Sequence, residues 1–196
     1  MPAHPKFAPE DQMTIAEFLA FTEARPQEEH WELIEGVAIM NPSPVRMHQR
    51  IAGNIDAFLL SEKERLGAAW LPLLGVGTEV PISPTSLPQP DVYVQEGGEA
   101  DMSHVTDDAI VIFEVLSRSN TKADQAWRRR VYSSVPNCRH YVTVSLRSAE
   151  VTVFDRDTQW TARTFAGLAA LVALPAIGVT LPLARIYRWT PLGQVS

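Results

Sequence analysis

Two short apolar runs, each containing one acidic residue, constrain the fold of this chain more than any other feature. They span residues 89–94 and 110–117 and have the length and the β-branched composition of strands. Asp91 follows a proline in the first run, whereas Glu114 lies between apolar residues in the middle of the second. Because an unpaired buried charge is costly, each carboxylate in such a setting needs a partner.

Two kinds of partner fit these carboxylates. If they converge from neighbouring strands, which lie ~4.8 Å apart, they would be within about 4 to 6 Å of each other and would suit a hard divalent cation such as Mg²⁺. Alternatively, Asp91 caps a turn and Glu114 pairs with an arginine, since structural ion pairs also place acids among apolar residues. The two runs by themselves leave both interpretations open.

The length and composition are those of an ordinary globular domain. A chain of 196 residues, 45% of them apolar and 20% charged, can bury a full core. We expect a flexible lead over residues 1–12, without the apolar core of a signal peptide, and a single domain over residues 13–196. The single cysteine, Cys138, excludes an internal disulfide and suits a reducing cytoplasm. The net charge of −6 argues against a protein that coats nucleic acid non-specifically, but it does not exclude a metal-dependent nuclease.

Capping and turn signals organise the first part of the chain. Thr14 and Glu17 form a capping-box pattern, so we expect a short helix there that ends before a proline. Residues 31–40 then have the pattern of a hairpin that turns at Glu35-Gly36. Glu32 lies between two apolar residues of this hairpin and is expected to point inward.

A long helix is expected next, from Val45 to Leu66, where Gly67 stops it. Its buried stripe begins after the first turn, so His48 is either solvated or placed to contact a phosphate. Two strands, at residues 69–74 and 77–82, are expected before the loop that leads to the first acidic run.

The second acidic run is followed by a helix with a basic face. A polar surface loop is expected over residues 95–108, before the run itself, and the helix over residues 122–134. Because consecutive helical residues point about 100° apart, at most two of the three arginines at 128, 129 and 130 can face one site. Closing strands are expected at residues 139–144, 150–155 and 159–165.

One uncharged stretch has membrane-spanning length. Residues 164–184 contain no charged side chain over 21 positions. However, Pro175, Gly178 and Pro182 interrupt the stretch, and small residues dilute its hydrophobicity. We therefore expect a buried short helix, a turn and a packed C-terminal segment rather than a transmembrane helix.

Five motifs in a fixed order give the chain a family resemblance. The motifs are Trp31-Glu32-Leu33-Ile34-Glu35-Gly36, His48-Gln49-Arg50-Ile51, Gln89-Pro90-Asp91-Val92, Glu114-Val115-Leu116-Ser117, and Asp124 with Tyr132. With these motifs the chain resembles the Uma family of bacterial proteins, which are labelled restriction endonucleases and are similar to the PD-(D/E)XK nuclease superfamily. The resemblance covers about residues 13 to 188 and implies an α/β fold with a restriction-endonuclease-like core, in which helices flank a mixed central β-sheet.

The resemblance also implies roles for individual acids and bases. Asp91 and Glu114 would be catalytic ligands of Mg²⁺ or Mn²⁺, and Glu32 would complete the acidic cluster. Arg128 stands where the family usually has a lysine, and unlike lysine it cannot give up its proton to activate water. It could still stabilise charge on a phosphate. Lys122 is the nearest lysine that could substitute.

The implied function is metal-dependent hydrolysis of phosphodiester bonds in DNA, with substrate contacts from His48 and Arg129. An alternative is a nuclease-like fold without catalysis that acts as a binding module; the lysine-to-arginine change and the acidic net charge favour it. A third reading is a metal-dependent hydrolase of a small phosphoester. A homodimer is left open, and no membrane association is expected.

Overall fold

A six-stranded mixed β-sheet forms the centre of the protein. The computed structural model describes residues 12–26, 28–75, 77–97, 99–117 and 120–194. The strand order is β10-β9-β8-β7-β5-β3; within this sheet β7 and β8 are parallel, and the other neighbouring strands are antiparallel. The strands are β3 (Leu71–Leu74), β5 (Val92–Gln95), β7 (Ala109–Leu116), β8 (His140–Ser145), β9 (Glu150–Asp155) and β10 (Thr161–Ala166).

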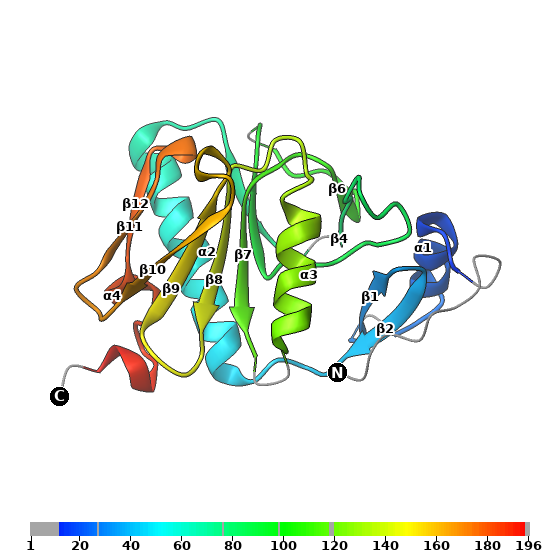
Figure 1. Cartoon of the computed structure of the whole chain (residues 1–196), viewed down its shortest axis with the longest axis horizontal. Coiled ribbons are helices and arrows are strands. Elements are labelled where there is room, and N and C mark those ends of the chain that lie inside the picture. Colours follow the sequence, from blue (N-terminus) through cyan, green and yellow to red (C-terminus); the bar gives the residue numbers. More distant parts are fainter. Residues whose placement is uncertain (1–11, 27, 76, 98, 118–119, 195–196) are drawn as a thin grey trace.

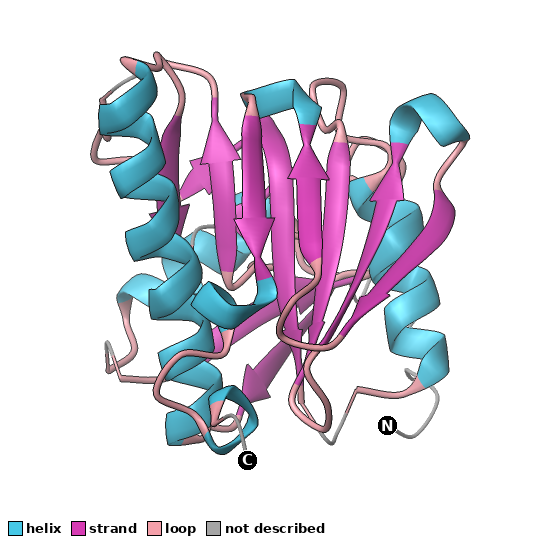
Figure 2. Cartoon of the chain, turned by 90° about the vertical axis from the view of Figure 1, so that its left-hand side faces the viewer, coloured by secondary structure: helices cyan, strands magenta, loops and turns pink. Residues whose placement is uncertain are grey.

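One helix covers each face of this sheet. Helix α3 (Lys122–Tyr132) connects the parallel strands β7 and β8, which need a crossover because a tight turn cannot join parallel neighbours. Helix α2 (Arg46–Leu66) lies on the opposite face, behind the sheet in Figure 1, while α3 lies in front. Figure 2 shows the two helical layers on either side of the strands. The predicted α/β fold, a mixed sheet flanked by helices, is confirmed.

The alternation of side chains along β7 determines to which face of the sheet Glu114 points. Val111, Phe113 and Val115 belong to the core cluster that includes the buried stripe of α2. Ile112 belongs to the second cluster, which lies under α3. Because successive strand residues point to opposite faces, Glu114 shares the face of Ile112 and points toward α3.

An N-terminal helix and hairpin flank the sheet, on the right in Figure 1. These are α1 (Ile15–Glu23), β1 (His30–Ile34) and β2 (Val37–Asn41). The predicted capping box is present, with Thr14 accepting from the backbone of Glu17 and Glu17 reaching back to Thr14. Glu35 and Gly36 both have positive φ, at 49° and 80°, as a two-residue hairpin turn of this kind requires. The backbone of Leu87 then bonds to that of Leu33 at 2.7 Å and holds the hairpin against the loop before β5.

The segment expected as a buried helix is instead a second hairpin. Strands β11 (Leu171–Leu174) and β12 (Val179–Pro182) pair antiparallel around a 3-10 turn at Pro175–Ile177. Their burial alternates residue by residue, but the outward positions include leucine and alanine, so the period of two is hidden in the sequence. The expected strand at 77–82 is also shorter, because β4 (Gly77–Thr78) pairs for two residues with β6 (Val105–Thr106).

The C-terminal part of the described chain contains the short helix α4 (Leu183–Ile186), which packs on α2, and the 3-10 turn η4 (Pro191–Gly193). Earlier in the chain, the 3-10 turn η2 (Arg156–Thr158) joins β9 to β10. Cys138 is fully buried in the cluster under α3, as expected for a packing residue. None of the described helices is both long enough and apolar enough to cross a membrane.

Candidate active site

A cleft of about 1230 Å³ opens where β5 begins and β7 ends. Its walls come from the β1–β2 hairpin, the first turns of α2, and one face of α3. Three acids predicted from the sequence line it together, namely Glu32, Asp91 and Glu114, with Arg128 and His48. Side chains separated by up to 96 positions in the chain therefore meet in one place.

Asp91 immediately precedes β5 and Glu114 lies in the neighbouring strand β7, and both residues line the cleft. Val92 is opposite Phe113 in the antiparallel pair of β5 and β7, so one further step in the register places Asp91 opposite Glu114. Cross-strand partners point to the same side of a sheet. The expectation that these two strands are neighbours is confirmed.

Asp91 is fixed from two sides. Its Oδ2 accepts the backbone N–H of Val115 at 2.6 Å, at the end of β7. The same oxygen lies 3.2 Å from Nε2 of His48, in the first turn of α2. Burial disfavours the imidazolium of His48, but the hydrogen bond to Asp91 and the charges of Asp91 and Glu114 outweigh it and raise the pKa of His48. The cationic form of His48 is therefore more favoured here than in a free histidine.

Glu114 is held by two donors from α3. Its Oε1 accepts from Arg128 Nη1 at 2.9 Å and from the hydroxyl of Tyr132 at 2.8 Å. Arg128 and Tyr132 are four residues apart on α3, so they share one face of that helix. The sequence motif contained Tyr132, but its contact with Glu114 was not predicted, and the four-residue spacing from Arg128 is the signal that could have indicated it.

Glu32 accepts two hydrogen bonds from the guanidinium of Arg128, whereas Glu114 accepts one. Arg128 Nη2 donates to both of its carboxylate oxygens, at 2.7 and 3.0 Å. The backbone N–H of Gln89 and the side chain of Asn41 add two further bonds, each at 2.7 Å. Burial would raise the pKa of Glu32, but the charge of Arg128 and these hydrogen bonds lower it. Glu32 is thus an ionised and fully partnered carboxylate.

One guanidinium therefore pairs with two carboxylates, while Asp91 pairs with His48. Burial, together with the charges of Asp91 and Glu32, raises the pKa of Glu114 to about 8, against the opposing effects of Arg128 and Tyr132. The neighbouring charges of Asp91 and Glu32 and the burial of Glu114 therefore oppose its ionisation. A divalent cation bound between Asp91 and Glu114 would favour the ionised form of Glu114.

The donor atoms in the cleft fit a hard cation. In the described part of the chain, Asp91 Oδ1 and Glu114 Oε2 accept no hydrogen bond, so one oxygen of each carboxylate remains available. The described residues contain no cluster of three or more His, Cys, Asp or Glu side chains suited to a metal. Mg²⁺ keeps several waters and uses one or two carboxylates, so two oxygens satisfy it where a zinc site would need more protein ligands.

Two predicted site residues lie outside the cleft. Lys122 is exposed at the first position of α3, and Arg129 is exposed with its guanidinium 5.2 Å from the centre of the Phe154 ring. Neither residue lines the cleft. Of the three consecutive arginines, Arg128 alone lines it, which agrees with the geometric limit stated above. The alternative in which Glu114 pairs with an arginine also describes part of the site correctly.

Comparisons with known proteins agree with this architecture. The Uma2 family model, described as "Putative restriction endonuclease", matches residues 15–184. A solved structure described as "a putative nuclease belonging to DUF820 from Anabaena variabilis ATCC 29413" is similar, with a TM-score of 0.72 and 17% identity. The likeness covers 90% of this chain and 98% of that one, and at this identity it shows a shared fold. No curated protein matches the chain. The family match extends over most of the sequence and confirms the resemblance, so this chain belongs to the Uma2 family.

Proposed function

We propose that this protein is a metal-dependent endonuclease that hydrolyses phosphodiester bonds of DNA. The observation that carries the proposal is the convergence of Asp91 and Glu114 from adjacent strands in one cleft, each with an available carboxylate oxygen. The family is described as one of restriction endonucleases and the similar solved structure as a nuclease, and both descriptions support a nuclease here. Fold alone does not establish activity, so the proposal depends on the chemistry of these residues.

The cation would be Mg²⁺ or Mn²⁺, held by Asp91 Oδ1 and Glu114 Oε2. When bound, it supplies Lewis-acid chemistry to a phosphate and makes water a better nucleophile near neutral pH. The role of the surrounding residues is to fix the two carboxylates. The N–H of Val115 orients Asp91, and the hydroxyl of Tyr132 orients Glu114. Preorganised ligands of this kind avoid the cost of rearrangement when charge develops.

His48 and Arg128 have different tasks in this proposal. The raised pKa of His48 favours its cationic form, which suits contact with a phosphate oxygen at the rim of the cleft. Arg128 remains charged and uses both terminal nitrogens on protein carboxylates, so it holds Glu32 and Glu114 in place rather than relaying a proton.

A nuclease-like binding module without catalysis is the second candidate. The observation that favours it is the same pair of contacts from Arg128, because a permanent cation already occupies one side of Glu114. In that case DNA would bind in the presence of metal but would not be cut.

The two candidates are separated by a cleavage assay on supercoiled plasmid and on single-stranded circular DNA, with Mg²⁺ or Mn²⁺ and with EDTA. An endonuclease nicks or linearises DNA only with metal, and Asp91→Asn abolishes the cutting. Asp157→Asn, which changes an exposed acid outside the cleft, is the matched control and should cut normally. If the wild-type protein cuts neither substrate under any of these conditions, the catalytic proposal is wrong.

A further inference from the structure

An exposed tryptophan with a strained backbone lies near the C-terminal end of the described chain. Trp189 exposes 71% of its surface, although large aromatic side chains are usually buried. Its φ is 60°, a conformation that side chains other than glycine and asparagine seldom adopt. Strain of this kind persists only where the surrounding structure enforces it, and it is common at binding sites.

Helix α2 enforces this conformation. The side-chain amide of Asn54, on α2, donates to the carbonyl oxygens of Ile186 at 2.9 Å and of Arg188 at 2.7 Å. Thr190 also donates from its hydroxyl to the carbonyl of Tyr187 at 2.6 Å. The residues immediately before and after Trp189 are therefore anchored, while the indole itself projects into solvent. Figure 2 shows the C-terminal segment beside the end of the long helix.

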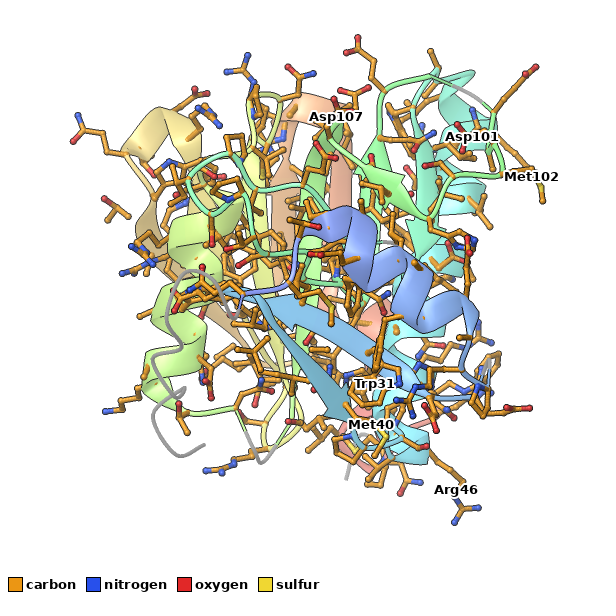
Figure 3. The ribbon with its side chains drawn as sticks, turned by 90° about the vertical axis from the view of Figure 1, so that its right-hand side faces the viewer. Trp31, Met40, Arg46, Asp101, Met102 and Asp107 are labelled. Carbon is orange, nitrogen blue, oxygen red and sulfur yellow. The ribbon has the colours of Figure 1, made fainter. Side chains whose placement is uncertain are left out.

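Two arginines flank the indole ring. The guanidinium of Arg188 lies 4.0 Å from the ring centre and that of Arg50, on α2, lies 5.9 Å from it. Both arginines are exposed, and neither forms an ion pair with any residue of the described ranges. Arg46 is one helical turn before Arg50, and Figure 3 shows its side chain pointing away from the molecule. These residues, Arg46, Arg50, Arg188 and Trp189, are called the Trp189 patch below.

The Trp189 patch shares helix α2 with the cleft. Gln49 and Gly53 line the cleft from α2, and Arg50 of the patch lies between them in the sequence, on a different side of the same helix. Although the whole chain carries a net charge of −6, three of the four residues of the Trp189 patch are arginines. A basic surface with an exposed aromatic ring is the combination that binds single-stranded nucleic acid, where arginines attract phosphates and unpaired bases stack on the ring.

We propose that the Trp189 patch binds an unpaired nucleotide of the DNA strand that enters the cleft. The base stacks on the free part of the indole, and Arg50 and Arg188 contact the adjoining phosphates. A base inside a duplex does not expose its face, so the patch selects single-stranded DNA or a frayed end over continuous duplex. The inference rests on the proposed function, since it takes DNA as the substrate, and it adds the strand form that the site prefers.

The test measures binding without cleavage. A short fluorescein-labelled single strand and the corresponding duplex are titrated with the full chain in EDTA, and fluorescence anisotropy gives both affinities. Trp189→Ala should weaken binding of the single strand by about tenfold, whereas Trp189→Phe, which keeps an aromatic face, should retain most of the affinity. Arg50→Gln and Arg188→Gln should each weaken binding. Each should also reduce the slope of log affinity against log salt concentration by about one, because one fewer counterion is released.

Two controls distinguish a binding role from damage to the fold. Trp160 also has a positive φ, 59°, and an arginine 5.2 Å from its ring, but it lies at the β9–β10 turn, where it is half-buried against the cluster under α3 instead of exposed beside α2, so Trp160→Ala should leave DNA affinity unchanged. Trp189→Gly removes the ring and relieves the positive φ, so it should weaken DNA binding while Tm stays the same or rises.

Unchanged single-strand affinity in Trp189→Ala would overturn the proposal. If that variant instead changes the sedimentation of the protein, the patch is a contact between two copies of the chain, which also overturns it. Failure here does not depend on failure of the proposed function, because the cleavage assay with Asp91→Asn needs no contribution from Trp189.

Discussion

Arg128 Nη2 lies 2.7 and 3.0 Å from the two carboxylate oxygens of Glu32, so that α3 is joined to the N-terminal hairpin inside the cleft. Trp127 adds a second bond between the same elements, from its indole N–H to Glu35 at 3.1 Å. Because Arg128 also donates to Glu114, one side chain connects α3, the hairpin and the central sheet. The acids of the site are therefore positioned by tertiary structure as well as by their own strands.

The first prediction concerns the stability of this junction. Arg128→Met should lower the free energy of unfolding by about 3 kcal/mol, because it leaves Glu32 and Glu114 buried beside each other without their cation. Arg130→Ala is the control on the same helix. Its ion pair with Glu35 is longer, at 3.8 Å, and solvent-exposed, so the loss should be below about 1 kcal/mol. Urea unfolding of both variants measures these values, and equal losses would show that the junction contributes no special stability.

The second prediction compares two buried tyrosines whose rings are 5.4 Å apart. Tyr132→Phe removes the hydroxyl that donates to Glu114 and should cost about 1 kcal/mol. Tyr141→Phe should be neutral or stabilising, because the Tyr141 hydroxyl is buried without a hydrogen-bond partner among the described residues. Thermal unfolding of the two variants tests the difference. A larger loss for Tyr141→Phe would contradict the hydrogen-bond assignment.

The third prediction concerns pH and a histidine away from the cleft. His140 is buried, its Nδ1 bonds to Asp155, and its Nε2 accepts the backbone N–H of Ala176 at 3.3 Å. Burial lowers the pKa of His140 below its ordinary value of 6.5, although Asp155 opposes the shift. The unfolded chain therefore takes up a proton as the pH falls through about 6.5, while the native protein takes it up at lower pH.

This difference makes the His140 contribution to stability complete above the unfolded pKa and progressively lost below it. Unfolding free energies of the wild-type protein and of His140→Asn are compared at about pH 7.5 and about pH 5.5. The wild-type protein should lose more stability on acidification than the variant does. An identical loss in both proteins would show that His140 does not titrate on unfolding.

Local signals in the sequence were sufficient for much of the fold. The capping box at Thr14, the stop at Gly67 and the turn at Glu35 depend on residues within a few positions of each other, and each is present as predicted. The C-terminal hairpin was missed because its outward positions, such as Leu171, are apolar and conceal the alternation of a strand. Tertiary packing, rather than local pattern, decided that segment.

The site was predictable to a lesser degree. Acids inside apolar strands indicated that Asp91 and Glu114 need partners, and the structure brings both to one cleft. Their partners come from helices packed on the sheet. The spacing of Arg128 and Tyr132 shows that these two side chains share one helix face, but which acid they contact, and the contact of His48 with Asp91, depend on how the helices pack. Lys122 and Arg129 were chosen for charge and proximity in sequence, and both are exposed on α3 at positions that do not line the cleft.

The fourth prediction tests the central claim, that Asp91 and Glu114 hold one divalent cation. Calorimetric titration with Mn²⁺ and Mg²⁺ is performed on the wild-type protein, Asp91→Asn, Glu114→Gln and the exposed-acid control Asp157→Asn. Glutamine should not disturb the fold, because the pKa of Glu114 is raised to about 8 and the amide replaces a largely protonated group near neutral pH. We predict that the wild-type protein and the control bind metal. Both cleft variants should lose the heat signal of binding, and in thermal unfolding they should also lose the rise in Tm that metal causes. Metal binding that survives both cleft substitutions, or that is absent from the wild-type protein, would contradict the claim.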